Sequence, residues 1–200
     1  VNVNNSRDLY AKTINLLGNT THISCVDATG NAAAITTSLG ETSGIVLSET
    51  GVTMNNFLGE ADVCHPLLLK KSGQRLLTMC SPLILESASN IYALGTGGSS
   101  RIPGALIQVV KAILDGQSIS DSVIQSRMHP YCQDQVEQIL LEPMNDAVVQ
   151  SIRSGHPNIE LTMFEDINLY FGGVHIAGLA NGLGVGVGDP RRSGSTIVSL

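Results

Sequence analysis

Residues 20–38 read TTHISCVDATGNAAAITTS, in which two runs rich in β-branched and small residues flank the segment 28–31. Runs of this kind on either side of a glycine-containing turn are typical of a β-hairpin. Along the first run Ile23 and Cys25 alternate with polar side chains, so the two faces of the hairpin should meet different neighbours. We therefore predict two paired strands, at 22–27 and 32–38.

The rest of the chain mixes strands and helices. Apolar runs bounded by turn-forming residues predict further strands at 44–48, 82–87, 91–96, 136–142, 168–177 and 182–189. Apolar side chains at helical spacing predict helices at 7–17, 103–114, 120–127 and 146–154, with Ser120 and Asn145 as caps of the last two. No repeat or long linker divides the chain. We therefore expect an α+β fold, a sheet-rich body with a helical layer.

The composition restricts the possible partners. The net charge is −6 and most Lys and Arg residues are scattered, which argues against a nucleic-acid surface. No apolar run approaches the roughly 20 residues that span a bilayer. Charged residues make up only 14% of the chain, where about 25% is usual. Either a partner chain covers part of the surface or the domain is simply compact and glycine-rich.

Cysteine and histidine show no metal-binding pattern. The four cysteines are widely spaced without C-x-x-C, and the five histidines lack ligand spacing, so we expect neither a metal nor a cofactor. Unpaired thiols favour a reducing compartment. The chain begins with Val1, and no charged-then-apolar leader follows, so we expect a piece or a processed product of a longer protein.

Thr20 opens the first predicted strand and is a candidate nucleophile. A threonine hydroxyl needs a neighbouring base. An N-terminal threonine supplies its own, because the pKa of an α-amino group is about 7.7–8.0. In this chain Thr20 is bonded to Asn19, and an amide nitrogen is not a base. The chemistry therefore requires cleavage before Thr20; without it, Thr20 is an ordinary strand residue.

A glycine-rich loop, Gly95-Thr96-Gly97-Gly98-Ser99-Ser100-Arg101, lies between a predicted strand and a predicted helix. Backbone N–H groups at such a place can point at an anion. The loop fits a phosphate cradle, a plain tight turn, or an oxyanion hole in which Gly97 and Gly98 donate. The spacing matches neither G-x-x-x-x-G-K-[ST] nor G-x-G-x-x-G, which disfavours the phosphate function.

Taken together, these segments resemble the small catalytic subunit of the γ-glutamyltransferase (γ-glutamyltranspeptidase) family of N-terminal-nucleophile hydrolases. The resemblance covers nearly all of 20–200. It rests on motifs in a fixed order: TTHISCVDATGNAAAITTS, GETSGIVLSETGVTMNNFLGEADV, RLLTMCSPLIL, GTGGSSRIP, NLYFGGVH and GDPRRSG.

The resemblance implies roles for individual residues. Thr20 matches the nucleophile, and Asn19–Thr20 matches the bond that the precursor cuts in itself. Ser38 matches a hydroxyl that hydrogen-bonds and orients the nucleophile. Gly97 and Gly98 match the glycine pair of the oxyanion hole. These assignments predict an acyl-enzyme mechanism at Thr20 with no cofactor.

Substrate-binding positions agree less well with the family. Glu60 lies near an acidic residue that holds the substrate's α-amino group, and Thr78 lies near a serine that contacts its α-carboxylate. Gly40, followed by Glu41, replaces an asparagine that touches the substrate in many relatives. Phe57 and Met79 replace polar residues. These departures leave the expected nucleophile intact but make the acyl group that this chain accepts uncertain.

The resemblance also implies an architecture and a partner. The family forms an αββα sandwich from two chains cut from one precursor, so this chain would supply about half of it. Residues 1–19 would be the tail of the large subunit, the heterodimer partner, and 20–200 the catalytic domain. The implied activity is γ-glutamyl transfer and hydrolysis on glutathione and related amides. The resemblance implies the periplasm or the outside of the cell, whereas the unpaired thiols favour the cytoplasm, so the sequence leaves the compartment open between the two. The alternatives are an N-terminal-threonine amidohydrolase with another acyl substrate and an uncleaved, non-catalytic form.

Overall fold

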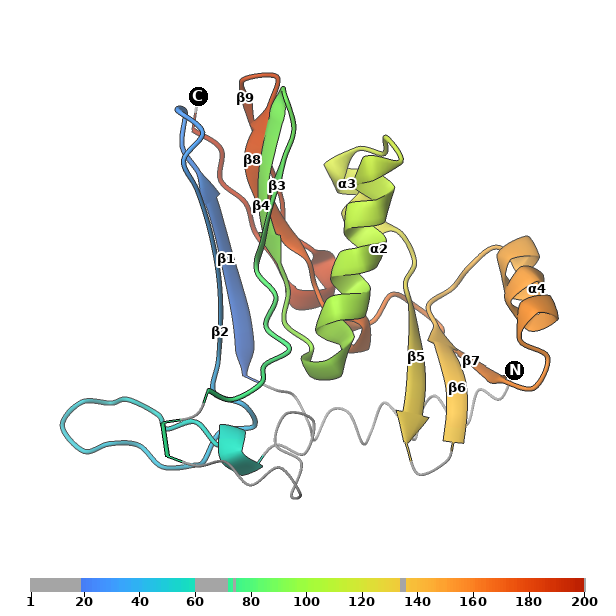
Figure 1. Cartoon of the computed structure of the whole chain (residues 1–200), viewed down its shortest axis with the longest axis horizontal. Coiled ribbons are helices and arrows are strands. Elements are labelled where there is room, and N and C mark those ends of the chain that lie inside the picture. Colours follow the sequence, from blue (N-terminus) through green and yellow to red (C-terminus); the bar gives the residue numbers. More distant parts are fainter. Residues whose placement is uncertain (1–18, 60–71, 74, 134–135, 200) are drawn as a thin grey trace.

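The structure is a computed structural model that describes residues 19–59, 72–73, 75–133 and 136–199. The helix predicted at 7–17 lies outside these residues. The described part of the chain forms a two-stranded, a four-stranded and a three-stranded sheet together with three α-helices (Figure 1). None of the helices in that part is long and apolar enough to cross a bilayer.

The predicted hairpin is confirmed. Strands β1 (Thr20–Val26) and β2 (Ala32–Ser38) pair antiparallel, with Ile23 opposite Ile35. The side chains alternate as the sequence predicts: His22 points inward and is buried, whereas Ile23 and Ile35 point outward and are 64% and 60% exposed. The hairpin therefore has one face packed within this chain and one apolar face open.

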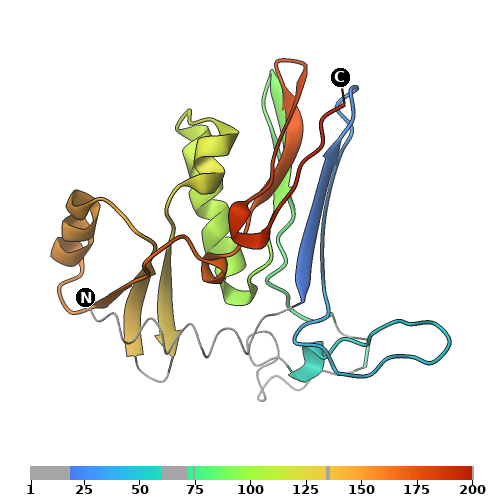
Figure 2. The same cartoon turned by 180° about the vertical axis from the view of Figure 1, so that it is seen from behind.

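The inner face of the hairpin packs on a four-stranded antiparallel sheet (Figures 1 and 2). In spatial order this sheet contains β3 (Leu83–Glu86), β4 (Asn90–Gly95), β8 (His175–Ala180) and β9 (Leu183–Val187). Strand β4 lies in its interior, and its residues 92–95 are all buried. Continuous burial of this kind explains the unbroken apolar sequence of β4, because both faces of the strand are covered.

A helical layer covers the opposite face of this sheet. Helix α2 (Ile102–Leu114) agrees with the predicted helix at 103–114, and α3 (Ile119–Ile124) follows it. The buried side chains of α2 recur at helical spacing, which directs one face of the helix at the sheet. The main core forms between these layers, from Tyr92, Leu94, Ile102, Ala105, Leu106, Val109, Val123, Val174 and Ile176.

The helix predicted at 120–127 is wrong at both ends. Ser118, not Ser120, is the N-cap, and its hydroxyl accepts a hydrogen bond from the backbone N–H of Asp121 at 3.0 Å. The helix ends before Gln125, which has an extended ψ of 149°. The chain then enters the interior at Arg127, a buried charge that helical periodicity gave no reason to expect.

A third sheet and a third helix lie beyond α2 (Figure 1). Helix α4 (Asp146–Gly155) confirms the prediction at 146–154, including its cap, Asn145. The sheet contains β5 (Met128–Gln133), β6 (Val136–Leu141) and β7 (Glu160–Met163), of which only β6 was predicted. β5 contains a proline and polar residues, and β7 has only four residues, so neither carries a clear strand pattern.

Two other predicted strands differ from the structure. The segment 44–48 forms only an isolated bridge between Val46 and Thr53. The segment 168–177, predicted as one strand, forms a strand only from His175 onward. Asn168 instead caps a short 3-10 helix over Leu169–Phe171. The α+β class is nevertheless confirmed. The hairpin, the four-stranded sheet and the helical layer are three successive layers of the expected αββα sandwich.

Candidate active site

Thr20 and Ser38 lie opposite each other in the register of β1 and β2. Their side-chain hydroxyl oxygens are 2.9 Å apart, within hydrogen-bond distance. Both side chains are half-buried, and the backbone N–H of Gly40 donates to Ser38 Oγ at 3.0 Å. The hydroxyl of Ser38 is therefore held in place from one side while it contacts the Thr20 hydroxyl on the other.

The peptide bond before Thr20 is paired with the chain beyond Ser38. The backbone N–H of Asn19 donates to Gly40 O at 2.9 Å, and the N–H of Leu39 donates to Asn19 O at 3.3 Å. The end of the strand pair at which Thr20 and Ser38 meet thus also holds the Asn19 backbone by two hydrogen bonds. An attack of Thr20 Oγ1 on that carbonyl carbon would take place within a fixed backbone.

The glycine-rich loop reaches this pair from the end of β4. A Cβ on Gly97 would lie 2.7 Å from Thr20 O, closer than real side chains approach, and would also lie 3.1 Å from Thr20 Cβ. Only glycine allows the two backbones to come together here. The structure thus brings Thr20, Ser38 and Gly97 together, while Gly98 lies against Gly172.

Thr96 connects this loop to a second glycine pair, Gly172–Gly173. Its buried hydroxyl donates to Gly97 O and accepts from the backbone N–H of Gly173, both at 2.8 Å. A buried hydroxyl with both a donor and an acceptor role satisfied fixes the positions of the two segments it joins. Local sequence gives no sign of this role of Thr96, because its partner lies 77 residues away.

Arg192 is a cation at the site. It belongs to the motif GDPRRSG, from which no function could be predicted for it. Its Nη1 donates to Thr20 O at 3.4 Å, and its aliphatic stem lies over Gly173. Burial, and then the nearby charge of Arg101, lower the pKa of Arg192. An arginine nevertheless remains protonated, so a positive charge lies beside the backbone of Thr20.

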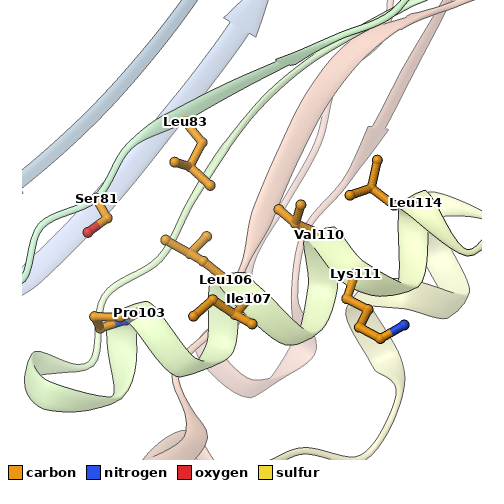
Figure 3. A pocket seen from close by; sticks show the side chains of 8 residues that line it. All are labelled: Ser81, Leu83, Pro103, Leu106, Ile107, Val110, Lys111 and Leu114. Atoms are coloured by element: carbon orange, nitrogen blue, oxygen red, sulfur yellow. The ribbon is translucent and has the colours of Figure 1, made fainter.

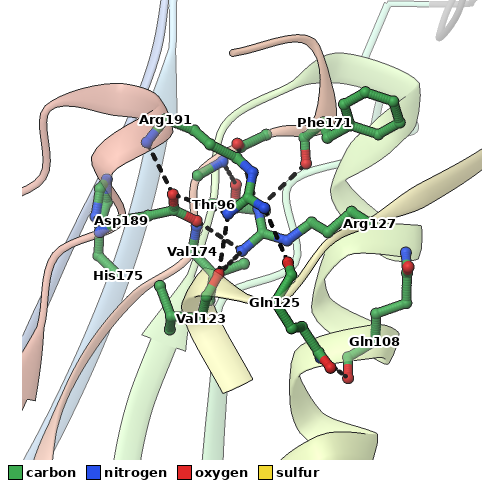
Figure 4. A network of polar contacts seen from close by, with 12 residues as sticks. Thr96, Gln108, Val123, Gln125, Arg127, Phe171, Val174, His175, Asp189 and Arg191 are labelled. Carbon is green, nitrogen blue, oxygen red and sulfur yellow. Dashed lines mark hydrogen bonds and ion pairs between the residues drawn. The ribbon is translucent and has the colours of Figure 1, made fainter. Parts of the chain in front are cut away.

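A buried ionic network (Figure 4) contacts the second glycine pair through a hydrogen bond to Gly172 O. Arg127 Nη2 and Asp189 Oδ2 are 2.6 Å apart, and both side chains are fully buried. Arg191 pairs with the buried Glu142 at 2.5 Å and with Asp189 at 3.3 Å. Charged residues are rarely buried unless they are paired, and this arrangement satisfies that condition with two arginines and two carboxylates.

The network holds the backbone of residues 171–174. Arg127 Nη1 donates to the carbonyl oxygens of Phe171 and Gly172, each at 3.3 Å, and Asp189 Oδ2 accepts from Val174 N–H at 2.9 Å. The same segment contains Gly173, which binds Thr96. The ion pairs therefore act on the Gly97 loop through the backbone that supports it.

His22 lies on β1 between the two sheets. Its ring nitrogens each lie 2.7 Å from a hydroxyl, those of Thr36 and Ser24, and its ring packs against Gly95. Burial first, and His175 second, lower the pKa of His22 to about 4. His22 is therefore neutral near pH 7, with one ring nitrogen donating and the other accepting. Both ring nitrogens of this buried side chain therefore have a hydrogen-bond partner within the chain.

The predicted substrate-binding residues are dispersed. Gly40 is buried beside Ser38, whereas Glu41 is exposed and its N–H donates to Asn56 Oδ1 at 2.8 Å. Thr78 is exposed, and Met79 packs against the main core. In the described part of the chain, neither Thr78 nor Met79 forms a hydrogen bond with Thr20. Glu60 lies outside the described residues.

An apolar groove of about 440 Å³ lies elsewhere, between α2 and the start of β3 (Figure 3). Its lining is almost entirely aliphatic and includes Leu83, Leu106 and Val110, with Ser81 at one end and Lys111 at the other. It shares no lining residue with the Thr20 site. In the described part of the chain, no three His, Cys, Asp or Glu side chains gather where they could hold a metal.

The chain matches a protein family and several known proteins. The model of the gamma-glutamyltranspeptidase family matches residues 3–199. A glutathione hydrolase proenzyme of Pseudomonas sp. (strain A14) is 27% identical over 157 residues, which are 66% of this chain and 26% of that protein. Acylase ACY 1 proenzyme of Pseudomonas sp. (strain SE83) is 31% identical over 115 residues, 54% of this chain and 20% of that protein. This chain therefore spans about a fifth to a quarter of the length of the curated relatives it matches.

Among solved structures, the gamma-glutamyltranspeptidase of Pseudomonas nitroreducens complexed with L-DON has a TM-score of 0.74. The match covers 90% of this chain and all of that one, with 24% sequence identity. A likeness at this level of sequence identity shows that the two chains share a fold.

Proposed function

Since this chain belongs to the gamma-glutamyltranspeptidase family, we propose that it is the catalytic part of a self-cleaving γ-glutamyl hydrolase and transferase, with Thr20 as the nucleophile. The proposal rests on the contacts of Thr20 with the Ser38 hydroxyl and with the Gly97 backbone. Thr20 Oγ1 lies 2.9 Å from Ser38 Oγ, and the Gly97 backbone lies directly against Thr20.

In the first stage the precursor cuts itself. Thr20 Oγ1 attacks the carbonyl carbon of Asn19, the peptide becomes an ester, and water releases Thr20 with a free amino group. The fixed pairing of Asn19 with Leu39 and Gly40 supports this step. Reacting groups that are already held in one geometry lose little further freedom of motion when they reach the transition state, so the barrier is lower.

In the second stage the freed amine of Thr20 acts as the base for its own hydroxyl. The hydroxyl attacks the γ-carbonyl of the substrate and forms an acyl-enzyme. The N–H groups of Gly97 and Gly98 stabilise the oxyanion, a contribution of about 2.7–4 kcal/mol for one such donor. Water or an acceptor amino acid then removes the acyl group.

The proposed domain arrangement divides the chain at this bond. Residues 1–19 are the tail of the large subunit, and 20–200 are the small-subunit domain. The open outer face of the hairpin, with Ile23 and Ile35, supports the large subunit as heterodimer partner, because an apolar face of this kind is normally covered. In this arrangement the partner supplies the fourth layer of the sandwich.

Glutathione and related γ-glutamyl amides are the proposed substrates. A second candidate is another acyl amide, favoured by the departures at Gly40, Phe57 and Met79 and by the similarity to an acylase proenzyme. A panel of γ-glutamyl and other acyl amides, offered to the full precursor, separates the two. Release from γ-glutamyl amides alone supports the first, and release from other acyl amides alone supports the second.

The role of Thr20 is tested with two variants of the full precursor. Thr20→Ala removes the hydroxyl and is expected to abolish both cleavage and amide hydrolysis, whereas Thr20→Ser keeps a hydroxyl and should retain measurable amounts of both. Cleavage or turnover by Thr20→Ala contradicts the proposal. A correctly folded wild-type precursor that neither cleaves nor hydrolyses any amide indicates the non-catalytic form.

A further inference from the structure

The hydrogen bonds around Asn19 continue the pairing just beyond the ends of β1 and β2, with the offset that is typical of a β-bulge. Leu39 N–H donates to Asn19 O, and Asn19 N–H donates to Gly40 O, so Leu39 and Gly40 both oppose Asn19. Gly40 has a φ of 69°, a left-handed conformation that glycine adopts without strain. Bulges are common next to active sites, where they re-aim a side chain or end the strand pairing.

We propose that the backbone N–H of Leu39 is the oxyanion donor of the self-cleavage step. The inference rests on the proposed function, because it concerns the first of its two stages. When Thr20 Oγ1 attacks the Asn19 carbonyl carbon, the negative charge develops on Asn19 O. The Leu39 N–H already points at that oxygen from 3.3 Å. Hydrogen bonds at a reacting group are often long before the reaction and tighten as charge develops.

The cleavage requires no reactant from outside the chain except one water molecule. A bond forms between Thr20 Oγ1 and the Asn19 carbonyl carbon, and the carbon–nitrogen bond breaks. The hydroxyl proton passes by way of the Ser38 hydroxyl, 2.9 Å away, to the departing nitrogen of Thr20. Water then hydrolyses the ester, which leaves a carboxylate on Asn19 and a free hydroxyl and amine on Thr20.

The donor is held in advance by its neighbours. The carbonyl oxygen of Leu39 accepts hydrogen bonds from the N–H groups of Thr42 and Asn56, both at 3.2 Å, and the next residue, Gly40, donates to Ser38 Oγ. A donor fixed before the reaction needs no reorganisation when the charge appears, which is the source of its effect on the rate.

This assignment separates the donors of the two stages. The Gly97 backbone lies against Thr20 O and Cβ, that is, against the residue that stays after cleavage. Leu39 N–H is bonded to the residue that is cut away. Removal of the Leu39 donor should therefore slow self-cleavage far more than it slows turnover, whereas a general loosening of the fold would slow both equally.

The test replaces the amide nitrogen of residue 39 by an ester oxygen in the full precursor, using leucic acid, so that the leucine side chain is unchanged. Intact mass followed over time gives the rate of cleavage between Asn19 and Thr20. Loss of one oxyanion donor is expected to slow it by about 10²–10³-fold. The matched control places an ester at Asn56, which removes a donor to the same loop and should slow cleavage by at most about tenfold.

A second measurement follows turnover separately from cleavage. The ester precursor is incubated until its cleavage is complete, and the resulting mature enzyme is purified. The expected result is that its fractional loss in kcat/KM for a γ-glutamyl amide is at least about tenfold smaller than the loss in cleavage rate. Cleavage at the rate of the Asn56 control, or equal losses in both measurements, overturns the assignment. An unsubstituted precursor that never cuts itself contradicts the proposed function instead.

Discussion

The hydroxyl oxygens of Thr20 and Ser38 lie 2.9 Å apart, and the backbone N–H of Gly40 donates to the second of them. Ser38 can therefore receive or relay the proton that Thr20 must lose before its oxygen attacks a carbonyl. The pairing is a consequence of strand register, because the two residues face each other where β1 begins and β2 ends.

Ser38→Ala should slow both self-cleavage and amide hydrolysis, by about 10²-fold or more if the hydroxyl assists proton transfer. Ser38→Thr keeps the hydroxyl at the same position and should retain most of both rates. Intact mass and kcat/KM on a γ-glutamyl amide measure the two effects. An alanine variant with wild-type rates would show that the contact only orders the strand ends.

Gly97→Ala tests the close approach of the glycine loop to Thr20. The new Cβ would lie 2.7 Å from Thr20 O, so either the loop or the nucleophile must move. A displacement of this kind near the reacting atoms is expected to lower kcat/KM by about 10²-fold.

Gly104→Ala in α2 is the matched control, because a Cβ there meets its nearest neighbour, His129 Nδ1, only at 3.8 Å. It should leave kcat/KM unchanged and raise the free energy of unfolding by about 0.4–1 kcal/mol. Equal activity in the Gly97 and Gly104 variants would contradict the described loop geometry.

Asp189→Asn breaks the buried ionic network. Arg127 loses its charged partner in the interior, where removal of one member of a buried pair costs about 3–5 kcal/mol. Urea unfolding of the uncut Thr20→Ala precursor, with and without Asp189→Asn, measures the loss as a lower free energy of unfolding.

Asp115→Asn provides the comparison, because Lys111 and Asp115 form an ion pair whose side chains are 71% and 56% exposed. Its effect should stay within about 1 kcal/mol. If both substitutions had the same small effect, Asp189 would not be buried in an ionic network as described.

His22 makes the stability of the fold depend on pH. Because its pKa is lowered to about 4 in the folded protein, the unfolded chain binds a proton first as the pH falls below about 6.5. The free energy of unfolding should therefore decrease between about pH 6.5 and pH 4, by roughly 3 kcal/mol for this residue.

His22→Gln should flatten this dependence, although part of it will remain because burial also lowers the pKa of His129 to about 4. His156, which is exposed, serves as the control for removal of a histidine. Urea unfolding at several pH values measures each slope. A slope unchanged by His22→Gln would contradict the burial of its ring.

Local patterns in the sequence predicted the elements that position the site. The hairpin, β4 and α2 each carry their own periodicity or apolar run, so their existence does not depend on distant residues. Strand β5 was missed because Pro130 and its polar neighbours do not follow a strand pattern, although β6 and the body of the domain hold it in place.

The support of the site could not be predicted from local patterns. Thr96 meets Gly173, and Arg127 meets Asp189, across separations of 77 and 62 residues. Such contacts depend on how the layers pack, and a charged residue is normally expected at the surface. Thr20 alone resembles any strand residue; it was singled out by the ordered motifs around it.

Self-cleavage before Thr20 is the claim on which the proposed mechanism depends. The most direct measurement is the intact mass of the full precursor after incubation near neutral pH. The account predicts two fragments whose masses place the cut between Asn19 and Thr20, and no cut in Thr20→Ala. A single uncut mass from correctly folded wild-type precursor, or a cut at any other bond, would contradict it.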